Sequence, residues 1–168
     1  MNKLNTKTTL AAFALATTLL SGCASWRAAP VGATLEQVTA RYGKPDAVYP
    51  VPDGGQMLEY RGQPMGQFQH MARMSADGHL VSYEQVLTTP NLARIQVAQW
   101  NKDEVLRNFG RPAEMGRDHA TGLEVWSYRY KQDGLWNSFF NVYMNGRGEV
   151  ARTDNSPDPL LDTRSKGP

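Results

Sequence analysis

The sequence predicts an α+β fold of two tandem units, each a short helix, or a helix pair, followed by a three-stranded antiparallel meander. Three observations support this prediction. A helix-and-turn segment occurs twice at a constant spacing of 67 residues, as Gly43 and Gly110 illustrate. Helix-capping residues open each copy. Alternating segments separated by hairpin dipeptides follow each copy.

The first 22 residues are typical of a lipoprotein signal peptide. Lys3 and Lys7 form a basic start, and the apolar run over residues 8–20 is too short for a membrane-spanning helix of about 20 residues. The run ends in LSGC, and Cys23 is the only cysteine of the chain. This tetrapeptide resembles the bacterial lipobox, which signal peptidase II reads. The resemblance implies cleavage before Cys23 and attachment of acyl chains, palmitate among them, to that residue.

Cleavage before Cys23 leaves 146 residues with 16 basic and 16 acidic side chains. A chain without net charge has no overall basic field to attract nucleic acid, so we expect no nucleic-acid partner. Residues 23–31 are expected to form a lipidated tether, because several acyl chains hold a protein on a membrane far better than one. By similarity to bacterial lipoproteins, Ala24 points to the periplasmic face of the outer membrane.

The first unit is expected over residues 32–88. Thr34 predicts a helix N-cap, and Gln37, three residues later, completes a capping box. Gly43 can supply the left-handed conformation that closes a helix, and Pro45 prevents its continuation. A polar loop follows, and strands are predicted near residues 56–61, 68–75 and 79–87.

The second unit is expected over residues 89–154. Asn101 and Glu104 predict a second capping box, and Gly110 and Pro112 predict the end of that helix. Strands are predicted near residues 123–131, 135–145 and 149–153, and an additional helix is predicted within residues 91–99. Residues 155–168 are expected to form a flexible C-terminal tail.

The helix-and-turn segments resemble a known family. GATLEQV over residues 32–38, closed by GKP over residues 43–45, is similar to the glycine-x-threonine-x-x-glutamine-valine and glycine-x-proline pattern of the BamE (SmpA/OmlA) family. Its members are outer-membrane lipoproteins, and its namesake is an accessory subunit of the machine that folds and inserts β-barrel proteins. The resemblance therefore implies a role in envelope assembly, with that machinery as the partner. The second copy departs from the pattern at Gln99 and Asn101.

Two alternatives to a scaffold role remain. Tandem units of this shape also resemble the β-lactamase inhibitor protein, which implies a periplasmic inhibitor or ligand-binding function. A copper-handling function is the third possibility, because thioethers and imidazole suit copper and His70, Met71 and Met74 lie close in sequence. Alternation along a strand puts Met71 on the opposite face from His70 and Met74, which favours the methionines as core residues.

The residues that carry chemistry indicate a non-catalytic protein. The three histidines, His70, His79 and His119, do not have metal-ligand spacing, and the sequence has no phosphate-binding glycine loop or nucleophile elbow. We therefore expect no enzymatic activity, no metal, no cofactor other than the lipid on Cys23, and no small-molecule substrate.

A candidate partner surface is the aromatic stripe of Trp126, Tyr128 and Tyr130, since these residues alternate along one strand face. Large aromatic side chains anchor protein interfaces, but they equally form the core under a helix, which is the interpretation that we favour. A loose basic group is a further candidate, either for lipid headgroups or as solvated charges: Arg107, Arg111 and Arg117.

Together these observations predict a non-catalytic, periplasm-facing outer-membrane lipoprotein. It is expected to bind an envelope protein as a scaffold module in envelope biogenesis, with Cys23 fixing it to the membrane.

Overall fold

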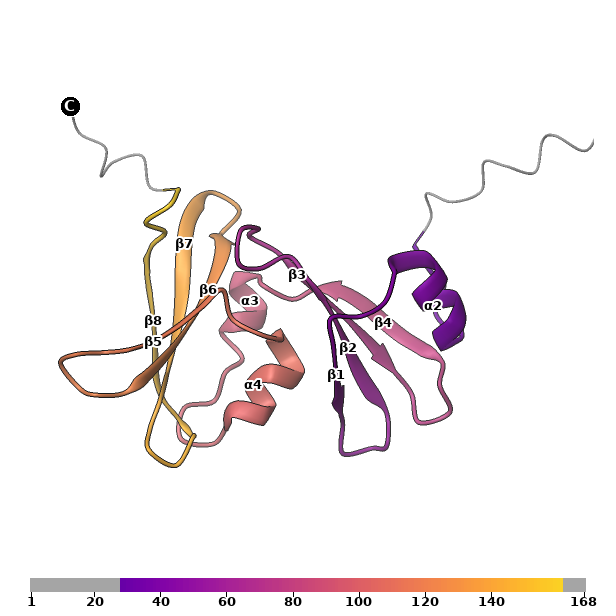
Figure 1. The fold of residues 1–168 in the computed structure, drawn as a ribbon, viewed down its shortest axis with the longest axis horizontal. Coiled ribbons are helices and arrows are strands. Elements are labelled where there is room, and N and C mark those ends of the chain that lie inside the picture. Colours follow the sequence, from indigo (N-terminus) through magenta and orange to yellow (C-terminus); the bar gives the residue numbers. More distant parts are fainter. Residues whose placement is uncertain (1–27, 162–168) are drawn as a thin grey trace, which may run out of the picture.

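Two four-stranded antiparallel sheets dominate the protein (Figure 1). The computed structural model describes residues 28–161, so the predicted signal peptide and Cys23 lie outside the described residues. The predicted fold class is wrong. The described chain is mainly β with a few short helices, and each unit has a four-stranded sheet where a three-stranded meander was predicted.

Consecutive strands pair throughout, in the orders β1-β2-β3-β4 and β5-β6-β7-β8. The first sheet consists of β1 (Ala47–Pro50), β2 (Gln56–Arg61), β3 (Gln69–Met74) and β4 (Leu80–Gln85). The second consists of β5 (Glu114–Arg117), β6 (Glu124–Gln132), β7 (Trp136–Met144) and β8 (Val150–Pro157). The helices of the described chain are α2 (Leu35–Tyr42), α3 (Thr89–Leu92) and α4 (Lys102–Phe109).

The two strands that the prediction missed are β1 and β5, which lie at sheet edges. Strand β1 has only four residues and ends in Pro50, which cannot donate a ladder hydrogen bond. All four residues of β5 are exposed, so the strand has no alternation of buried and exposed side chains. Because both edge strands have only four residues, neither was recognised between the helix and the first predicted strand of its unit.

Both predicted capping boxes are present. In the first, the Gln37 amide donates to Thr34 Oγ1 at 3.3 Å, and the Thr34 amide donates to Gln37 Oε1 at 2.9 Å. In the second, the Glu104 amide donates to Asn101 Oδ1 at 3.1 Å, and the Asn101 amide donates to Glu104 Oε2 at 2.8 Å. These reciprocal bonds start α2 and α4 at equivalent positions of the two units.

Gly43 and Gly110 end the two helices, but in a different conformation from the one predicted. Their φ angles are 86° and 67°, as a glycine terminator requires, while their ψ angles are −177° and −160°. The backbone is therefore extended and lies outside the left-handed helical region, in a region that is essentially accessible to glycine alone.

Two segments around the second unit differ from the prediction. The helix expected within residues 91–99 is limited to α3, which starts after its N-cap Thr88 and ends at Leu92. The flexible tail was expected from residue 155, whereas β8 continues to Pro157 and the next residue, Asp158, is fully buried.

The duplication extends over whole units. An isolated bridge joins Thr34 to His79 in the first unit, and another joins Asn101 to Glu149 in the second. A register shift falls at the end of β3, between Arg73 and Met74, and at the equivalent place in β7. Each unit therefore repeats the same helix, sheet and bulge.

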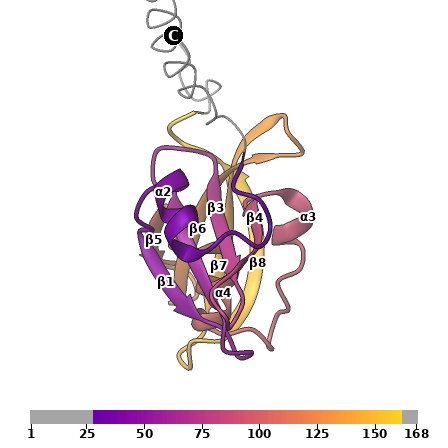
Figure 2. The ribbon, with the colours of Figure 1, turned by 90° about the vertical axis from the view of Figure 1, so that its right-hand side faces the viewer.

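Helices and sheets alternate across the molecule in the order α2, first sheet, α4, second sheet (Figures 1 and 2). Helix α2 covers the outer face of the first sheet over a small core: Ala33, Val38, Leu58, Tyr60, Ala72, Met74 and Leu80. Helix α4 lies between the sheets, and Val105 and Phe109 belong to a larger core that includes Met71 from the first sheet and Tyr128 from the second. The units are thus packed together through α4.

Candidate functional site: a groove between the two units

The aromatic stripe predicted as a partner surface is buried. Trp126, Tyr128 and Tyr130 project from β6 toward α4 and belong to the larger core. The Tyr128 hydroxyl donates a 2.8 Å hydrogen bond to the carbonyl of Gly110, at the end of α4. These side chains therefore position the helix, and an exposed site has to be formed by other residues.

A buried carboxylate joins the two units. Glu59, in β2, accepts hydrogen bonds from the Tyr49 hydroxyl at 2.5 Å, from Gln69 Nε2 at 2.9 Å and from the backbone amide of Arg111 at 3.2 Å. Burial and the neighbouring carboxylate raise the pKa of Tyr49, so its hydroxyl remains a donor. The first sheet thereby holds the chain just beyond the C-terminus of α4.

A second junction lies between the β2–β3 loop and the edge of β6. The Gln63 side chain pairs with the Arg129 backbone as a strand would: Nε2 donates to the carbonyl at 2.7 Å, and Oε1 accepts from the amide at 3.2 Å. Gln67 Nε2 donates to the Tyr130 carbonyl at 3.2 Å. Together the two junctions fix one unit against the other.

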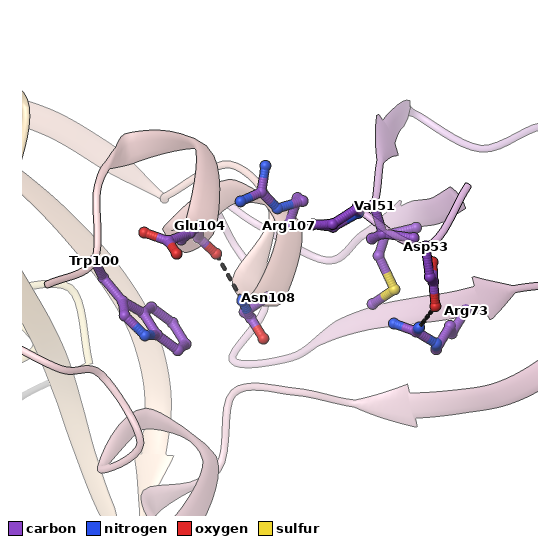
Figure 3. Close-up of a pocket in the computed structure, with 9 residues that line it drawn as sticks. Val51, Asp53, Arg73, Trp100, Glu104, Arg107 and Asn108 are labelled. Carbon is purple, nitrogen blue, oxygen red and sulfur yellow. Dashed lines mark hydrogen bonds and ion pairs between the residues drawn. The ribbon is translucent and has the colours of Figure 1, made fainter. Parts of the chain in front are cut away.

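The units enclose a groove of about 360 Å³ beside α4 (Figure 3). One wall is the face of α4 that carries Glu104, Arg107 and Asn108, and the other is the inner face of the first sheet with its β1–β2 turn. The remaining lining residues are Val51, Pro52, Asp53, Met57, Arg73 and Trp100.

Apolar side chains contribute to both walls of this groove. Met57 and Trp100 are half-buried and pack against the edge of the larger core. The Trp100 ring lies 6.1 Å from the ring of Phe109. Because Trp100 precedes the N-cap of α4, the capping box that starts the helix also places the indole in the groove.

The charged groups of the groove differ in whether they are neutralised. Arg73 and Asp53 form an ion pair on the first sheet. The Glu104 carboxylate accepts the capping bond of Asn101. Within residues 28–161, by contrast, no hydrogen bond or ion pair is found for the Arg107 guanidinium. An unpaired cation on a partly apolar groove is suited to an anionic group of a ligand.

The groups proposed for copper do not converge. Met71 is buried in the larger core on one side of the first sheet, and Met74 is buried in the small core on the other side. His70 stacks on Tyr83 with ring centroids 5.1 Å apart, and burial lowers its pKa. In the part of the chain that the structure describes, no group of three histidine, cysteine or acidic side chains is placed to hold a metal ion.

Sequence reasoning singled out only part of this groove. Arg107 was noted as one of a loose basic group. Asp53 and Met57 were not identified, because nothing in the local sequence shows that the β1–β2 hairpin lies across from a helix some fifty residues away.

None of the helices described between residues 28 and 161 has the length and apolar character needed to cross a membrane. Neither a protein-family model nor a curated protein matches this sequence. Among solved structures, the chain is similar to a cysteine-rich secretory protein from Staphylococcus aureus subsp. aureus Mu50. The similarity covers 78% of this chain and 44% of that one, at 15% identity and a TM-score of 0.27. This chain therefore spans less than half of that protein's length, and a likeness at this level carries no argument about fold or function.

Proposed function

We propose that the protein is a non-catalytic lipoprotein on the periplasmic face of the bacterial outer membrane, where it binds an envelope protein. The lipobox at Cys23 supports the anchoring, and the resemblance of residues 32–45 to the BamE (SmpA/OmlA) family supports a role in envelope assembly, with β-barrel assembly as the first pathway to test. In this proposal no residue of the described chain has a catalytic role.

The observation that carries the binding proposal is the groove beside α4. It combines half-buried apolar side chains, Met57 and Trp100, with the unpaired cation of Arg107. Aromatic residues, methionine and arginine are the types enriched at protein interfaces. The partner segment that fits has an apolar side chain for Met57 and Trp100, and an acidic side chain or carboxyl terminus for Arg107.

The proposal is tested by crosslinking in intact cells, purification of the lipidated protein and mass spectrometry of the proteins recovered with it. Arg107→Glu reverses the charge of the groove, and we expect it to reduce partner recovery severalfold. Arg94→Glu makes the same change at an exposed position outside the groove lining and serves as the matched control.

The identity of the recovered protein separates the possible functions. Barrel-assembly subunits that are lost in Arg107→Glu support the family's role. Another envelope protein with the same dependence supports binding in a different pathway, while a soluble periplasmic enzyme favours an inhibitor function. Equal recovery with Arg107→Glu and Arg94→Glu contradicts the groove as the binding site.

A further inference from the structure

One end of the molecule exposes large apolar side chains from three different segments. Leu135 and Trp136, at the tip of the β6–β7 hairpin, are 71% and 55% exposed. Met65, in the β2–β3 loop, is 74% exposed, and Leu160 and Leu161, after β8, are exposed as well. An exposed apolar group of this kind marks a surface for a protein or a membrane.

Hydrogen bonds hold these three segments side by side. Asn137 Oδ1 accepts from Gln67 Nε2 at 3.1 Å, which ties the hairpin to the β2–β3 loop. Asn137 Nδ2 donates to the Leu161 carbonyl at 3.2 Å, and the Asp158 amide donates to the Asn137 carbonyl at 3.1 Å. The Arg129 guanidinium binds both Asp158 and the carbonyl of Pro64. These bonds fix the three segments beside one another at this end of the molecule.

The described chain begins toward this same end of the molecule, but on the first unit. In both views its start, beside α2, lies toward the top, as do the β6–β7 hairpin, the β2–β3 loop and the C-terminal end of the described chain (Figures 1 and 2). The described chain starts at Ala28, five residues after Cys23. Since an extended chain spans at most about 3.5 Å per residue, Cys23 lies within about 18 Å of Ala28. An acylated Cys23 therefore keeps this end close to the bilayer.

We propose that this apolar end rests on the lipid bilayer, with the tip at Leu135 and Trp136 inserted into the interface between headgroups and acyl chains. The proposal rests on the proposed lipid anchor at Cys23. Tryptophan favours this interface because its ring is apolar and its N–H is polar, and leucine adds apolar area. Since the contact is apolar, it does not require anionic headgroups.

This orientation also determines where the groove beside α4 lies relative to the bilayer. Strand β2 runs from the β1–β2 turn, which carries Asp53, to the β2–β3 loop at the apolar end. The turn side of the groove therefore lies at the far end of the first sheet from the bilayer. A partner in the periplasm reaches the groove while the protein remains on the membrane.

The test uses the full, lipidated protein in phosphatidylcholine vesicles, with a single environment-sensitive fluorophore on an introduced cysteine. Leu135→Cys and Met65→Cys place the probe on two segments of the apolar end. Arg147→Cys places it in the turn at the opposite end of β7, where the side chain is 80% exposed. We expect the emission at positions 135 and 65 to shift to the blue and to be quenched by nitroxide lipids, and the emission at 147 to remain that of a probe in water.

The outcomes distinguish this proposal from the function proposed above, because the mass of the Cys23 peptide is measured on the same sample. Acylated Cys23 with water-like emission at both 135 and 65 overturns the membrane-facing end and leaves the anchor intact. Quenching at 147 equal to that at 135 also overturns it. An unmodified Cys23 overturns the anchor and with it this orientation. Normal melting of each variant ensures that a water-like probe reports orientation and not a misfolded hairpin.

Discussion

Glu59, in the second strand of the first sheet, accepts a hydrogen bond from the backbone amide of Arg111 across the boundary between the two units, at 3.2 Å. The same carboxylate is buried and also bonds Tyr49 and Gln69. Because Arg111 directly follows the glycine that ends α4, this contact holds the helix on the first sheet. The position of α4 in turn forms one wall of the groove.

Glu59→Ala is expected to lower the free energy of unfolding by about 3 kcal/mol, because the Tyr49 hydroxyl and the Arg111 amide lose their acceptor in a partly buried position and Gln69 Nε2 loses one of its acceptors. Urea unfolding measures the change. Glu84→Ala, at an exposed position on the neighbouring part of the sheet, is the control and is expected to change stability by less than about 0.5 kcal/mol. Equal effects of the two substitutions would contradict the structural role of Glu59.

Gly43 and Gly110 allow a comparison of two equivalent helix ends. Both have positive φ angles, so Gly43→Ala is expected to cost about 1–2 kcal/mol through backbone strain alone. A Cβ atom at Gly110 would also lie 2.2 Å from Gln69 Nε2 and 2.8 Å from the Glu59 carboxyl carbon, whereas one at Gly43 meets nothing within 4 Å. Gly110→Ala is therefore expected to cost about 1–3 kcal/mol more than Gly43→Ala. Denaturant midpoints of the two variants check this, and equal losses would be inconsistent with the close approach at Gly110.

The buried pair of Arg129 and Asp158 is expected to stabilise the C-terminal end of the second sheet. Arg129 Nε lies 2.6 Å from Asp158 Oδ2, both side chains are buried, and the guanidinium stacks over the Phe139 ring at 4.7 Å. Asp158→Ala leaves a buried cation without this partner and is expected to cost about 3–5 kcal/mol. Thermal unfolding measures the loss.

Asp103→Ala removes an exposed carboxylate from the first turn of α4 and is the control for Asp158→Ala. Its expected cost is below about 1 kcal/mol. A loss for Asp158→Ala as small as this would show that residues after β8 do not contribute to the fold.

His70 is expected to make the protein less stable in mild acid. Burial lowers its pKa in the folded state, so the unfolded chain binds the proton more readily. The stabilising contribution of the neutral ring is complete above the unfolded pKa of about 6.5, and it is lost as the pH falls through the folded pKa. His70→Phe introduces the aromatic residue that Phe140 provides in the second unit and removes the titration.

Melting temperatures at pH 8 and pH 5 check this pH dependence. Between these values the wild type is expected to lose more stability than His70→Phe does, and His119→Phe, at an exposed site, is the matched control. The same loss in wild type and His70→Phe would contradict a neutral, partly buried His70.

The parts of the fold that could be predicted from the sequence are those that local chemistry determines. Thr34 and Asn101 cap helices because their side chains reach amides three residues away, and glycines end both helices because few other residues adopt positive φ. The strands β1 and β5 could not be predicted in this way, because each has only four residues, and β5 in addition buries no face and leaves no alternating pattern.

The candidate site depends on contacts between the units and was largely hidden in the sequence. The aromatic stripe at Tyr128 has the composition of an interface, but the same composition is found in a core, and the packing of α4 decides between them. From the local sequence alone, Glu59 would be interpreted as a solvent-exposed strand residue. Its hydrogen-bond partner Arg111 lies 52 positions away and is known only from the structure. Met57 and Trp100 meet in the groove only because the first sheet packs on α4.

The central claim, that the groove beside α4 binds an envelope protein, is tested most directly by photocrosslinking in intact cells. A photoreactive amino acid replaces Asn108 in the groove, which leaves Arg107 in place, or Arg94 outside it, and mass spectrometry identifies the adducts of the lipidated protein. The account predicts a specific envelope protein crosslinked from position 108 and absent from position 94. Adducts from position 108 that do not exceed those from position 94 would contradict it.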